Sequence, residues 1–215
     1  IALLELTLVH LIKESIMLIL KIIAAILLSV SLSIVLFVVQ LKSNSGFGSV
    51  SNGDWTTSLD TGSENAGVMQ KAAVAIGGLL ASKRESSIYY RLSTIDGKPL
   101  TINCSYRIEG SDYDANWWSI TAYGWDNYLL PNKLQRYSYN NDNLTRDDSG
   151  NWAVRVSAKP QNGDWLPIGS AGGDEWNNFS GHDFDLLLRL YTPGTAYLQA
   201  PSTAVLPKVV EEGCS

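Results

Sequence analysis

The sequence has few cysteines and few histidines, with two of each among 215 residues. These numbers exclude a disulfide-built scaffold and zinc sites of the finger type, and we expect no metal site and no cofactor. Charged residues are also scarce, at 17% of the chain, and the formal net charge is −5. Nucleic-acid-binding domains usually present a clustered basic face. The composition therefore predicts no nucleic-acid partner.

One long stretch has no charged side chain at all. Residues 22–41 are apolar except for three serines and a glutamine, and Lys21 and Lys42 bracket them. A helix of 20 residues spans about 30 Å, which is the thickness of a bilayer's hydrocarbon core. The terminal ammonium groups can reach the headgroups on either side. We expect residues 1–42 to hold a membrane anchor that spans the lipid bilayer at 22–41, with a short helix along the membrane surface before it.

A cleaved signal peptide is the main alternative to the anchor. Its apolar region is usually about 7–15 residues long and precedes a small-x-small cleavage site. The run here is longer, and no Ala-x-Ala follows it, so an uncleaved signal anchor is favoured. Lys13 and Lys21 precede the span and Lys42 alone follows it. The positive-inside rule then predicts a single-pass membrane protein with a cytoplasmic N-terminus and an exported C-terminal domain, which in a bacterium means the inner membrane and the periplasm.

The anchor helix also carries small polar residues on one side. Ser29 and Ser33 lie four residues apart and so share a helix face. Small residues let two helices approach closely in a membrane. These two serines are our candidates for packing against another transmembrane helix.

The remaining chain divides into a tether and a β-rich domain. Residues 43–53 are rich in Ser, Gly and Asn, which is typical of a flexible linker. Apolar residues at helical spacing predict one principal helix near 66–81. Beyond it, short apolar or aromatic runs are separated by turn signals, of which Asp96-Gly97 is the strongest hairpin signal. We expect strands at 88–95, 100–108, 117–125, 136–139, 152–158 and 184–191, followed by an extended tail.

Short strands at turn-marked intervals behind one helix favour a mainly β fold class: an antiparallel β-sandwich, or jelly roll, over residues 54–215. Because side chains alternate between the two faces of a strand, the pattern also predicts a core. The residues expected to point inward are Tyr106, Ile120, Val154, Val156, Leu188 and Leu190.

Several segments in fixed order resemble a known family. They are NWWSITAYGWDNYLLPNKLQRYS, GNWAVRVS, GDWLPIG and FDLLLRLYTP, with GDWTTSLDTGSENAG, IYYRL, DGKPL and CSYRIEG before them. Together they resemble the bacterial domain-of-unknown-function family 1214, in its short, membrane-anchored branch, over roughly residues 53–210. The resemblance implies a jelly-roll-like β-sandwich in an envelope protein of undefined role, and it supplies no catalytic residues.

Candidates for chemistry are weak. His182 lies next to Asp183 and near Asp185, and such a pair can act as a general base; the alternative is an ordinary loop histidine before the last strand. The turn at Asp147 lacks the glycine and glutamate positions of a calcium loop, so we interpret it as a turn former. Cys104 is expected within a strand as a buried, inert side chain, and a disulfide with Cys214 is the alternative in an oxidising compartment.

The aromatic content is the least ordinary feature. Seven Trp and ten Tyr occur, all beyond residue 54. Trp117 and Trp118 are adjacent on a predicted strand, so one of them must point away from the core. Exposed Trp and Tyr bind sugars by stacking or proteins as hot spots, whereas buried ones fill the core. The candidate aromatic binding face is Trp117, Trp118, Trp125, Trp165 and Trp176.

Three functions remain open at this point. The favoured one is a non-catalytic accessory or structural subunit that docks from the periplasmic side onto other membrane-protein subunits, for example of a respiratory or light-harvesting assembly. The first alternative is an envelope module that binds a glycan or another small ligand. The second is an enzyme whose polar residues converge in a pocket that no motif reveals.

Overall fold

The structure is a computed structural model that describes residues 2–42, 49–76, 82–169 and 183–214. The chain divides into two units, Ile1–Ser45 and Gly46–Ser215. The first is a helix and the second is a β-rich domain, and each is described by itself.

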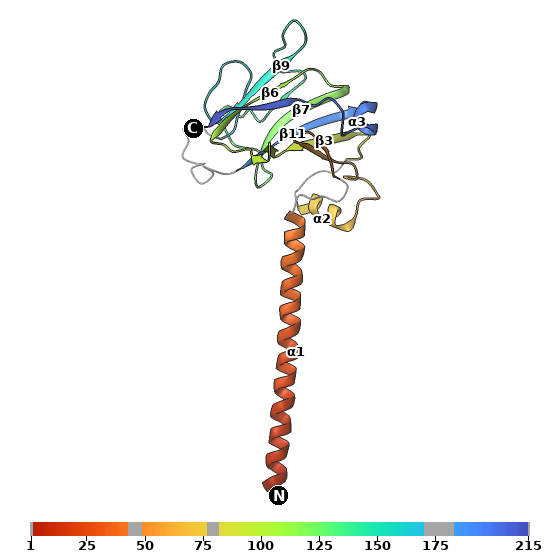
Figure 1. The fold of residues 1–215 in the computed structure, drawn as a ribbon, viewed down its shortest axis with the longest axis vertical. Helices are drawn as coiled ribbons and strands as arrows, with labels where there is room; N and C mark the ends of the chain where they lie inside the picture. Colours follow the sequence, from red (N-terminus) through yellow and green to blue (C-terminus); the bar gives the residue numbers. More distant parts are fainter. Residues whose placement is uncertain (1, 43–48, 77–81, 170–182, 215) are drawn as a thin grey trace. The chain divides into compact units, whose positions relative to one another are not determined.

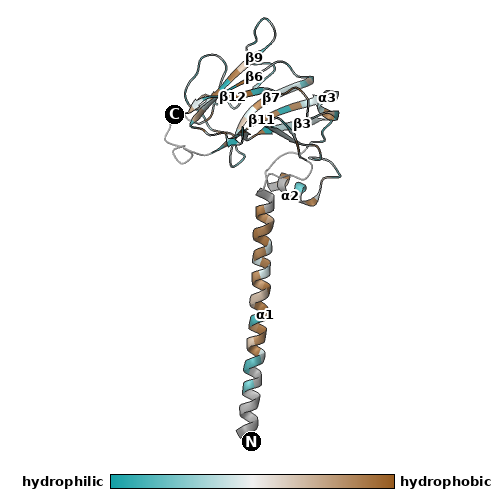
Figure 2. Cartoon of the chain, viewed as in Figure 1, coloured by the Kyte–Doolittle hydropathy of each residue, from teal (hydrophilic) through white to brown (hydrophobic). Residues whose placement is uncertain are grey.

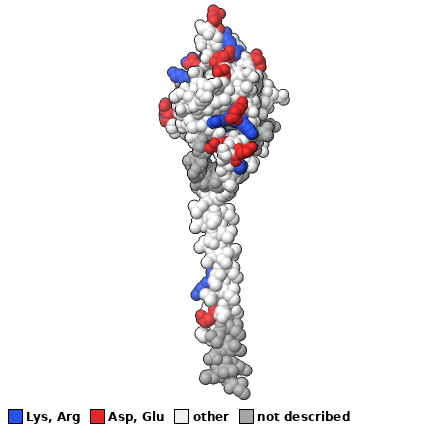
Figure 3. Space-filling view, turned by 90° about the vertical axis from the view of Figure 1, so that its right-hand side faces the viewer, with Lys and Arg blue, Asp and Glu red and all other residues white. Residues whose placement is uncertain are grey.

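The first unit is a single helix, α1 (Ala2–Lys42). At 41 residues it is about 60 Å long. Its segment Lys13–Val39 is long and apolar enough to cross a membrane, which fits an anchor and a signal sequence alike. Brown, hydrophobic residues dominate this segment in Figure 2, and charged atoms are confined to its N-terminal part in Figure 3. The expected separate surface helix is wrong, because the helix runs from Ala2 without a break.

The serines of α1 return their hydroxyl groups to the helix backbone. Ser29 Oγ donates to the Ile26 carbonyl, Ser31 Oγ to Leu27 and Ser33 Oγ to Ser29, each at 2.8 Å. This bonding satisfies the hydroxyls inside the helix itself, so they can lie in hydrocarbon without an unpaired donor.

The second unit contains two packed sheets, as Figure 1 shows. Both predicted principal elements are present: the helix near 66–81 is α2 (Val68–Ile76), and the β-sandwich is mainly antiparallel. A short helix, α3 (Thr195–Gln199), follows the last strand of the larger sheet. The larger sheet has the order β1 (Ser49–Asn52), β2 (Trp55–Ser58), β3 (Ser87–Leu92), β11 (Phe184–Pro193), β7 (Ala115–Gly124) and β8 (Ser138–Asn140). The smaller sheet has the order β10 (Trp165–Pro167), β9 (Trp152–Ser157), β6 (Cys104–Gly110) and β12 (Lys208–Cys214).

The core lies between the inner faces of the two sheets. The six residues predicted to point inward are each 1% exposed or less, which confirms the alternation read from the sequence. Truncation of a leucine in such a position, for example Leu188→Ala, costs roughly 2–5 kcal/mol. The core is aromatic as well as aliphatic: the largest of its fully buried side chains are Trp118, Tyr90, Tyr106 and Phe184.

The predicted turn at Asp96-Gly97 is present, but the longer strands on either side of it, β3 and β6, belong to different sheets and do not pair. Both residues have positive φ, 51° and 77°, and they join β4 (Thr94–Ile95) to β5 (Lys98–Pro99). Positive φ at both central positions is the requirement of a type I′ turn, which Asp-Gly meets at low cost.

Two expectations about the ends of the domain are wrong. Residues 49–53, assigned to the flexible tether, form β1 and the turn at Gly53, while 43–48 lie outside the described residues. The tail is not an extended surface segment throughout, because 195–199 form the helix α3 and 208–214 join the smaller sheet as β12, paired antiparallel with β6. β12 begins at Lys208, directly after Pro207. β10 also pairs parallel with β9, a local exception to the antiparallel pattern.

The tail is fastened to the first hairpin of the domain. Asn52 Nδ2 donates to the carbonyls of Pro201 and Ala204 at 3.1 and 2.7 Å. Trp55 Nε1 donates to the Pro207 carbonyl at 2.9 Å. These contacts join segments about 150 residues apart, so the β1–β2 hairpin and residues 201–207 lie side by side.

Candidate functional site

The outer face of the larger sheet is unusually aromatic. Since Trp118 and Ile120 on β7 and Leu188 and Leu190 on β11 point into the core, their neighbours must point outward. On this outward face, large aromatic and guanidinium side chains lie beside small ones; Ser119, for example, is opposite Arg189. We call it the outer aromatic face, defined by Tyr89, Arg91, Trp117, Tyr123, Arg189 and Tyr191.

Contacts among these side chains hold them in place. The Arg189 guanidinium lies over the Tyr123 ring, 5.3 Å from its centroid, and also donates to the Tyr123 hydroxyl. Trp117 and Tyr191 meet edge to face at 5.4 Å, and Trp117 Nε1 donates to Asp142 Oδ2 at 3.0 Å. Trp117, Tyr123 and Tyr191 are therefore each held by a neighbour on another element, which reduces the side-chain entropy that they would lose on binding.

A loop after β7 folds onto the same face. Arg91 on β3 forms an ion pair with Asp185 on β11 at 3.5 Å and donates to Asn127 Oδ1 at 2.8 Å. Because β11 separates β3 from β7 in the sheet, the Arg91 side chain bridges β11 to reach Asn127. The loop thus continues the outer aromatic face.

This loop also carries exposed apolar side chains, and we call residues 125–134 the aromatic loop. Within it Trp125 is 61%, Tyr128 74%, Leu129 41% and Leu134 54% exposed. They are four of the seven exposed large hydrophobic side chains found among the described residues of the domain. Apolar exposure is therefore concentrated on one short segment, which is typical of an interaction site.

The aromatic loop is ordered by its own hydrogen bonds. Asn132 Nδ2 donates to the carbonyls of Leu130 and Arg136, and its Oδ1 accepts the Arg136 backbone N–H. Arg136 in turn donates to the Trp165 carbonyl at 3.0 Å. Leu130 is buried at 4% exposure and anchors the loop in the core. The exposed side chains are thus presented on a fixed backbone.

The predicted tryptophan face is only partly right. Trp117 and Trp118 do point to opposite faces: Trp117 is half-buried on the outer side, and Trp118 is 1% exposed in the core. Trp125 is exposed as predicted, but Trp165 is buried, with Nε1 donating to the Ser157 carbonyl. Trp118 and Trp165 therefore cannot belong to a binding face, and Trp176 lies outside the described residues.

The sequence prediction named only tryptophans and missed the tyrosines, arginines and leucines of the outer aromatic face and the aromatic loop. The alternation in the segment 184–191 places Arg189 and Tyr191 opposite its leucines, and that signal was sufficient to find them. No sequence pattern indicated that Tyr128 and Leu134 lie exposed on the loop, since their exposure follows from the way Asn132 and Leu130 tie down the backbone between them.

The outer face of the smaller sheet is different in character. Arg107 pairs with Glu109 at 2.6 Å and with Glu212 at 3.3 Å, and Arg155 pairs with Glu212 at 3.5 Å. Such partly exposed ion pairs contribute little to stability and are typical of a solvated surface. The two outer faces of the sandwich are thus chemically unlike.

The acidic candidates have structural partners. Asp147 Oδ1 accepts the backbone N–H groups of Ser149 and Asn151, and these bonds, led by that of Asn151, lower the pKa of the exposed Asp147 carboxyl. The turn-former interpretation is therefore confirmed. Asp185 pairs with Arg91, as described above, and His182 lies outside the described residues.

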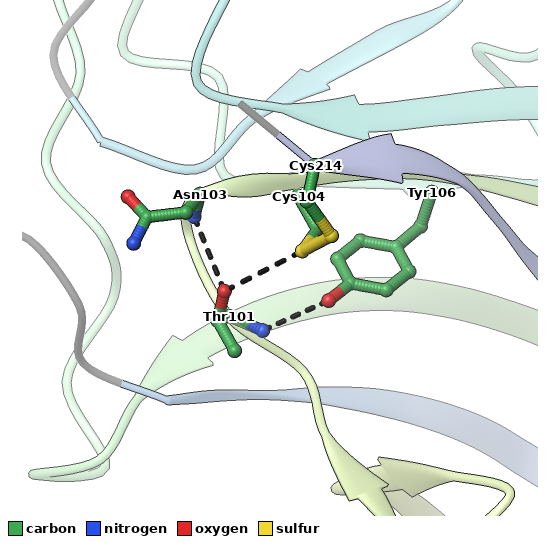
Figure 4. Close-up of a disulfide and its surroundings, with 5 residues drawn as sticks. All are labelled: Thr101, Asn103, Cys104, Tyr106 and Cys214. Carbon is green, nitrogen blue, oxygen red and sulfur yellow. Dashed lines mark hydrogen bonds between the residues drawn. A yellow bond between two sulfur atoms is a disulfide. The ribbon is translucent and has the colours of Figure 1, made fainter.

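The two cysteines form a disulfide, so the expectation of an inert thiol at Cys104 is wrong (Figure 4). Their sulfurs and a Glu211 carboxylate oxygen lie within 4.8 Å of one another, a grouping that could hold a metal ion if both thiols were free. In the disulfide the two sulfurs are bonded to each other, so the Glu211 carboxylate is the one metal ligand that remains in this group. Beneath it the Thr101 N–H donates to the Tyr106 hydroxyl, whose pKa is raised by burial.

Comparison with known proteins gives a family and a fold. A family model described as a protein of unknown function (DUF1214) matches residues 85–195. The chain is similar to the crystal structure of the VPA0106 protein from Vibrio parahaemolyticus, with a TM-score of 0.53 and 18% identity over 69% of this chain and 36% of that one. It is also similar to a putative uncharacterized protein from Burkholderia cenocepacia, with a TM-score of 0.37 and 18% identity over 58% and 30% of the two chains.

The chain spans about a third of the length of these two solved structures. At such low identity the likeness to the Vibrio protein shows the fold alone. No curated protein matches the chain.

Proposed function

The chain belongs to the DUF1214 family of proteins of unknown function, and we propose that it is a membrane-anchored, non-catalytic accessory subunit. In this proposal α1 anchors the chain in the bacterial inner membrane, and the β-sandwich docks from the periplasmic side onto another membrane-protein subunit. The docking surface is the outer aromatic face together with the aromatic loop.

The observation that carries the proposal is the contrast between the two outer faces of the sandwich. One presents ion pairs among Arg107, Glu109, Arg155 and Glu212, while the other presents Trp, Tyr and Arg side chains and continues into four exposed apolar ones. Trp, Tyr and Arg are the residue types that carry most of the binding energy at protein interfaces. Their fixed positions lower the entropic cost of binding.

Because the anchor holds the domain at the membrane, a weak contact between the domain and its partner would be sufficient for docking. Six residues separate Lys42 at the end of α1 from Ser49 at the start of β1. Such a linker reaches about 25 Å at most. It keeps the domain close to the membrane and raises its effective concentration toward a membrane-bound partner into the millimolar range.

Periplasmic orientation has two supports. Lys13 and Lys21 precede the apolar segment whereas Lys42 alone follows it, which favours a cytoplasmic N-terminus. The disulfide between Cys104 and Cys214 is of the kind that persists in oxidising compartments such as the periplasm. Protease added to intact spheroplasts should digest the domain, and protection from the protease would contradict this orientation.

Site-specific photo-crosslinking in native membranes tests the docking surface. A photoreactive amino acid in place of Tyr128 should give one discrete adduct with a membrane protein. The matched control replaces Ala153, an exposed residue on the outer face of the smaller sheet, and should give none. Equal adducts at both positions, or none at Tyr128, would contradict the proposal.

A second experiment separates the two parts of the contact. Residues 22–41 are replaced by an unrelated membrane span in one variant, and Trp125 and Tyr128 are changed to Ala in another. Each change should weaken co-purification of the crosslinked partner in mild detergent. If neither alters what co-purifies, the docking proposal is wrong.

A further inference from the structure

A second feature of the domain lies apart from the docking surface, at the end of β12, the edge strand of the smaller sheet. The disulfide between Cys104 and Cys214 joins β12 to β6. The Glu211 carboxylate lies beside it, with an oxygen within 4.8 Å of both sulfurs. None of these residues belongs to the outer aromatic face or to the aromatic loop.

A β-bulge brings Glu211 and Cys214 to the same side of β12. In a regular strand, residues three positions apart point to opposite faces. Here the register shifts between Glu211 and Gly213, where Gly213 has a φ of 148°. Glu211 therefore lies opposite Tyr106. Cys214 lies opposite Cys104, which shares a face of β6 with Tyr106. Bulges at sheet edges re-aim side chains in this way.

The Glu211 carboxylate is accessible and has no ion-pair partner among the described residues. Its neighbour Glu212 differs, because it pairs with Arg107 at 3.3 Å and with Arg155 at 3.5 Å on the outer face of the sheet. Glu211 and Cys214 are both exposed. An ion can therefore reach this carboxylate from solvent, and no cation of the described chain competes for it.

A hydroxyl group contacts the less exposed sulfur, that of Cys104. Thr101 Oγ1 accepts the Asn103 backbone N–H at 3.3 Å and donates to Cys104 Sγ at 3.7 Å (Figure 4). A donor to sulfur favours the thiolate over the thiol. Such outer donors also orient the ligands of a metal ion and tune their strength.

Two thiolates and one carboxylate form a ligand set for zinc. Thiolates select Zn²⁺ over Mg²⁺ and Ca²⁺, and a water molecule completes the four-coordinate geometry when the protein supplies three ligands. With Zn–S distances of about 2.3 Å, two sulfurs on one tetrahedral ion lie roughly 3.8 Å apart. Opening of the disulfide frees the sulfurs to reach this separation by rotation of the exposed Cys214 side chain.

We propose that reduction of the Cys104–Cys214 disulfide converts this group into a site for one Zn²⁺ ion. The reductant is a dithiol of the Cys-x-x-Cys class. One of its thiolates attacks the Cys214 sulfur, Cys104 leaves as a thiolate, and the second thiol of the reductant resolves the mixed disulfide. The reductant becomes a disulfide and the domain gains two thiols. Zn²⁺ then binds both sulfurs and Glu211 and displaces the two thiol protons.

The ion fastens β12 to β6 in the reduced state, as the disulfide does in the oxidised state. The edge strand thus stays in the sheet in both redox states. This role goes beyond docking and does not depend on it, because the two sites have no residue in common.

Cadmium binding to the full chain in lipid nanodiscs tests the site. Cd²⁺ is the probe because its thiolate complexes absorb in the ultraviolet, and a phosphine is the reductant because it brings no thiol of its own. The reduced chain should bind one Cd²⁺ with this absorption. Excess Zn²⁺ should displace the Cd²⁺, whereas excess Mg²⁺ should not. The oxidised chain should show no such absorption.

Two matched variants test the carboxylate. Glu211→Gln should weaken Cd²⁺ binding at least about tenfold, since changes to outer partners alone cost 10–100-fold. Glu212→Gln removes the same charge from the other side of β12 and should leave binding unchanged. Because Glu211 is exposed, the melting temperature of the oxidised Glu211→Gln variant should equal that of the unmodified chain, which separates loss of binding from loss of folding.

Stability provides a second measurement. An ion that binds the folded state raises the free energy of unfolding. Zn²⁺ should therefore raise the urea midpoint of the reduced chain. The variant with both cysteines replaced by serine should not respond to Zn²⁺.

Four outcomes would overturn the proposal. They are no thiolate absorption from the reduced chain with Cd²⁺; one ion shared by two chains; displacement of Cd²⁺ by Mg²⁺; and equal Cd²⁺ affinities of the Glu211→Gln and Glu212→Gln variants. None of these bears on the crosslink at Tyr128, so the docking proposal and the zinc proposal can fail separately.

Discussion

Cys214 at the end of β12 is bonded to Cys104 at the start of β6, directly opposite it in the register of the two strands. β12 is the edge strand of the smaller sheet and pairs only with β6. Much of its side-chain surface is exposed, so burial alone holds it weakly. The disulfide fastens this strand and closes a loop of 110 residues.

The first prediction concerns this bond. Replacing both cysteines by serine should lower the free energy of unfolding of the domain by roughly 2–5 kcal/mol, because the unfolded chain is then no longer cross-linked. Urea unfolding with and without a reducing agent measures the loss. The double variant serves as control and should not respond to the reductant. If the reductant destabilised the double variant as much as the unmodified protein, the loss of stability would not come from the disulfide.

The second prediction uses the adjacent tryptophans. Trp118→Ala should cost roughly 3–5 kcal/mol, since it empties a fully buried position. Trp117→Ala should cost only about 1 kcal/mol, because it removes an edge-to-face contact with Tyr191 on the surface. Chemical denaturation of the two variants provides the comparison. Equal losses would contradict the assignment of the two residues to opposite faces.

The third prediction concerns alkaline pH. Burial, with a smaller effect of Asp114, raises the pKa of Tyr197 from 10.0 to about 12. Since the folded state holds this proton more tightly, the contribution to stability is complete below pH 10 and is lost as the pH rises through about 12. Unfolding in denaturant should therefore become easier over this interval. Tyr197→Phe cannot ionise and should show a smaller loss, whereas an unchanged pH profile would contradict the assignment.

The fourth prediction tests the serines of α1. Ser29→Ile and Ser33→Ile together should reduce co-purification of a membrane partner, because bulky side chains keep a second helix at a distance. Ser31→Ile is the matched control, since Ser31 lies two positions away on a different side of the helix. A similar reduction by the control would show that the loss does not depend on the Ser29 and Ser33 face.

Alternation of side chains predicted most of the sandwich. Strands such as β9 and β11 can be recognised from the sequence, because one face of each is buried and apolar residues therefore recur at every second position. The candidate site was harder, because which tryptophans are exposed depends on contacts between distant segments. Trp165 is buried next to such a distant segment: its backbone N–H donates to the Tyr139 hydroxyl, 26 residues away. The sequence left the disulfide undecided for the same reason. Cys104 and Cys214 meet because β12 pairs with β6, and their spacing in the sequence does not show this pairing.

The fastening of Asn52 and Trp55 to residues 201–207 also sets an order of events. The β1–β2 hairpin forms near the start of the domain, yet its hydrogen-bond partners come about 150 residues later. Contacts between such distant segments form slowly, because a long loop must close first. We therefore expect the sandwich to be completed only after residues 201–207 have been synthesised. Until then the Asn52 side chain and the Trp55 indole lack these acceptors.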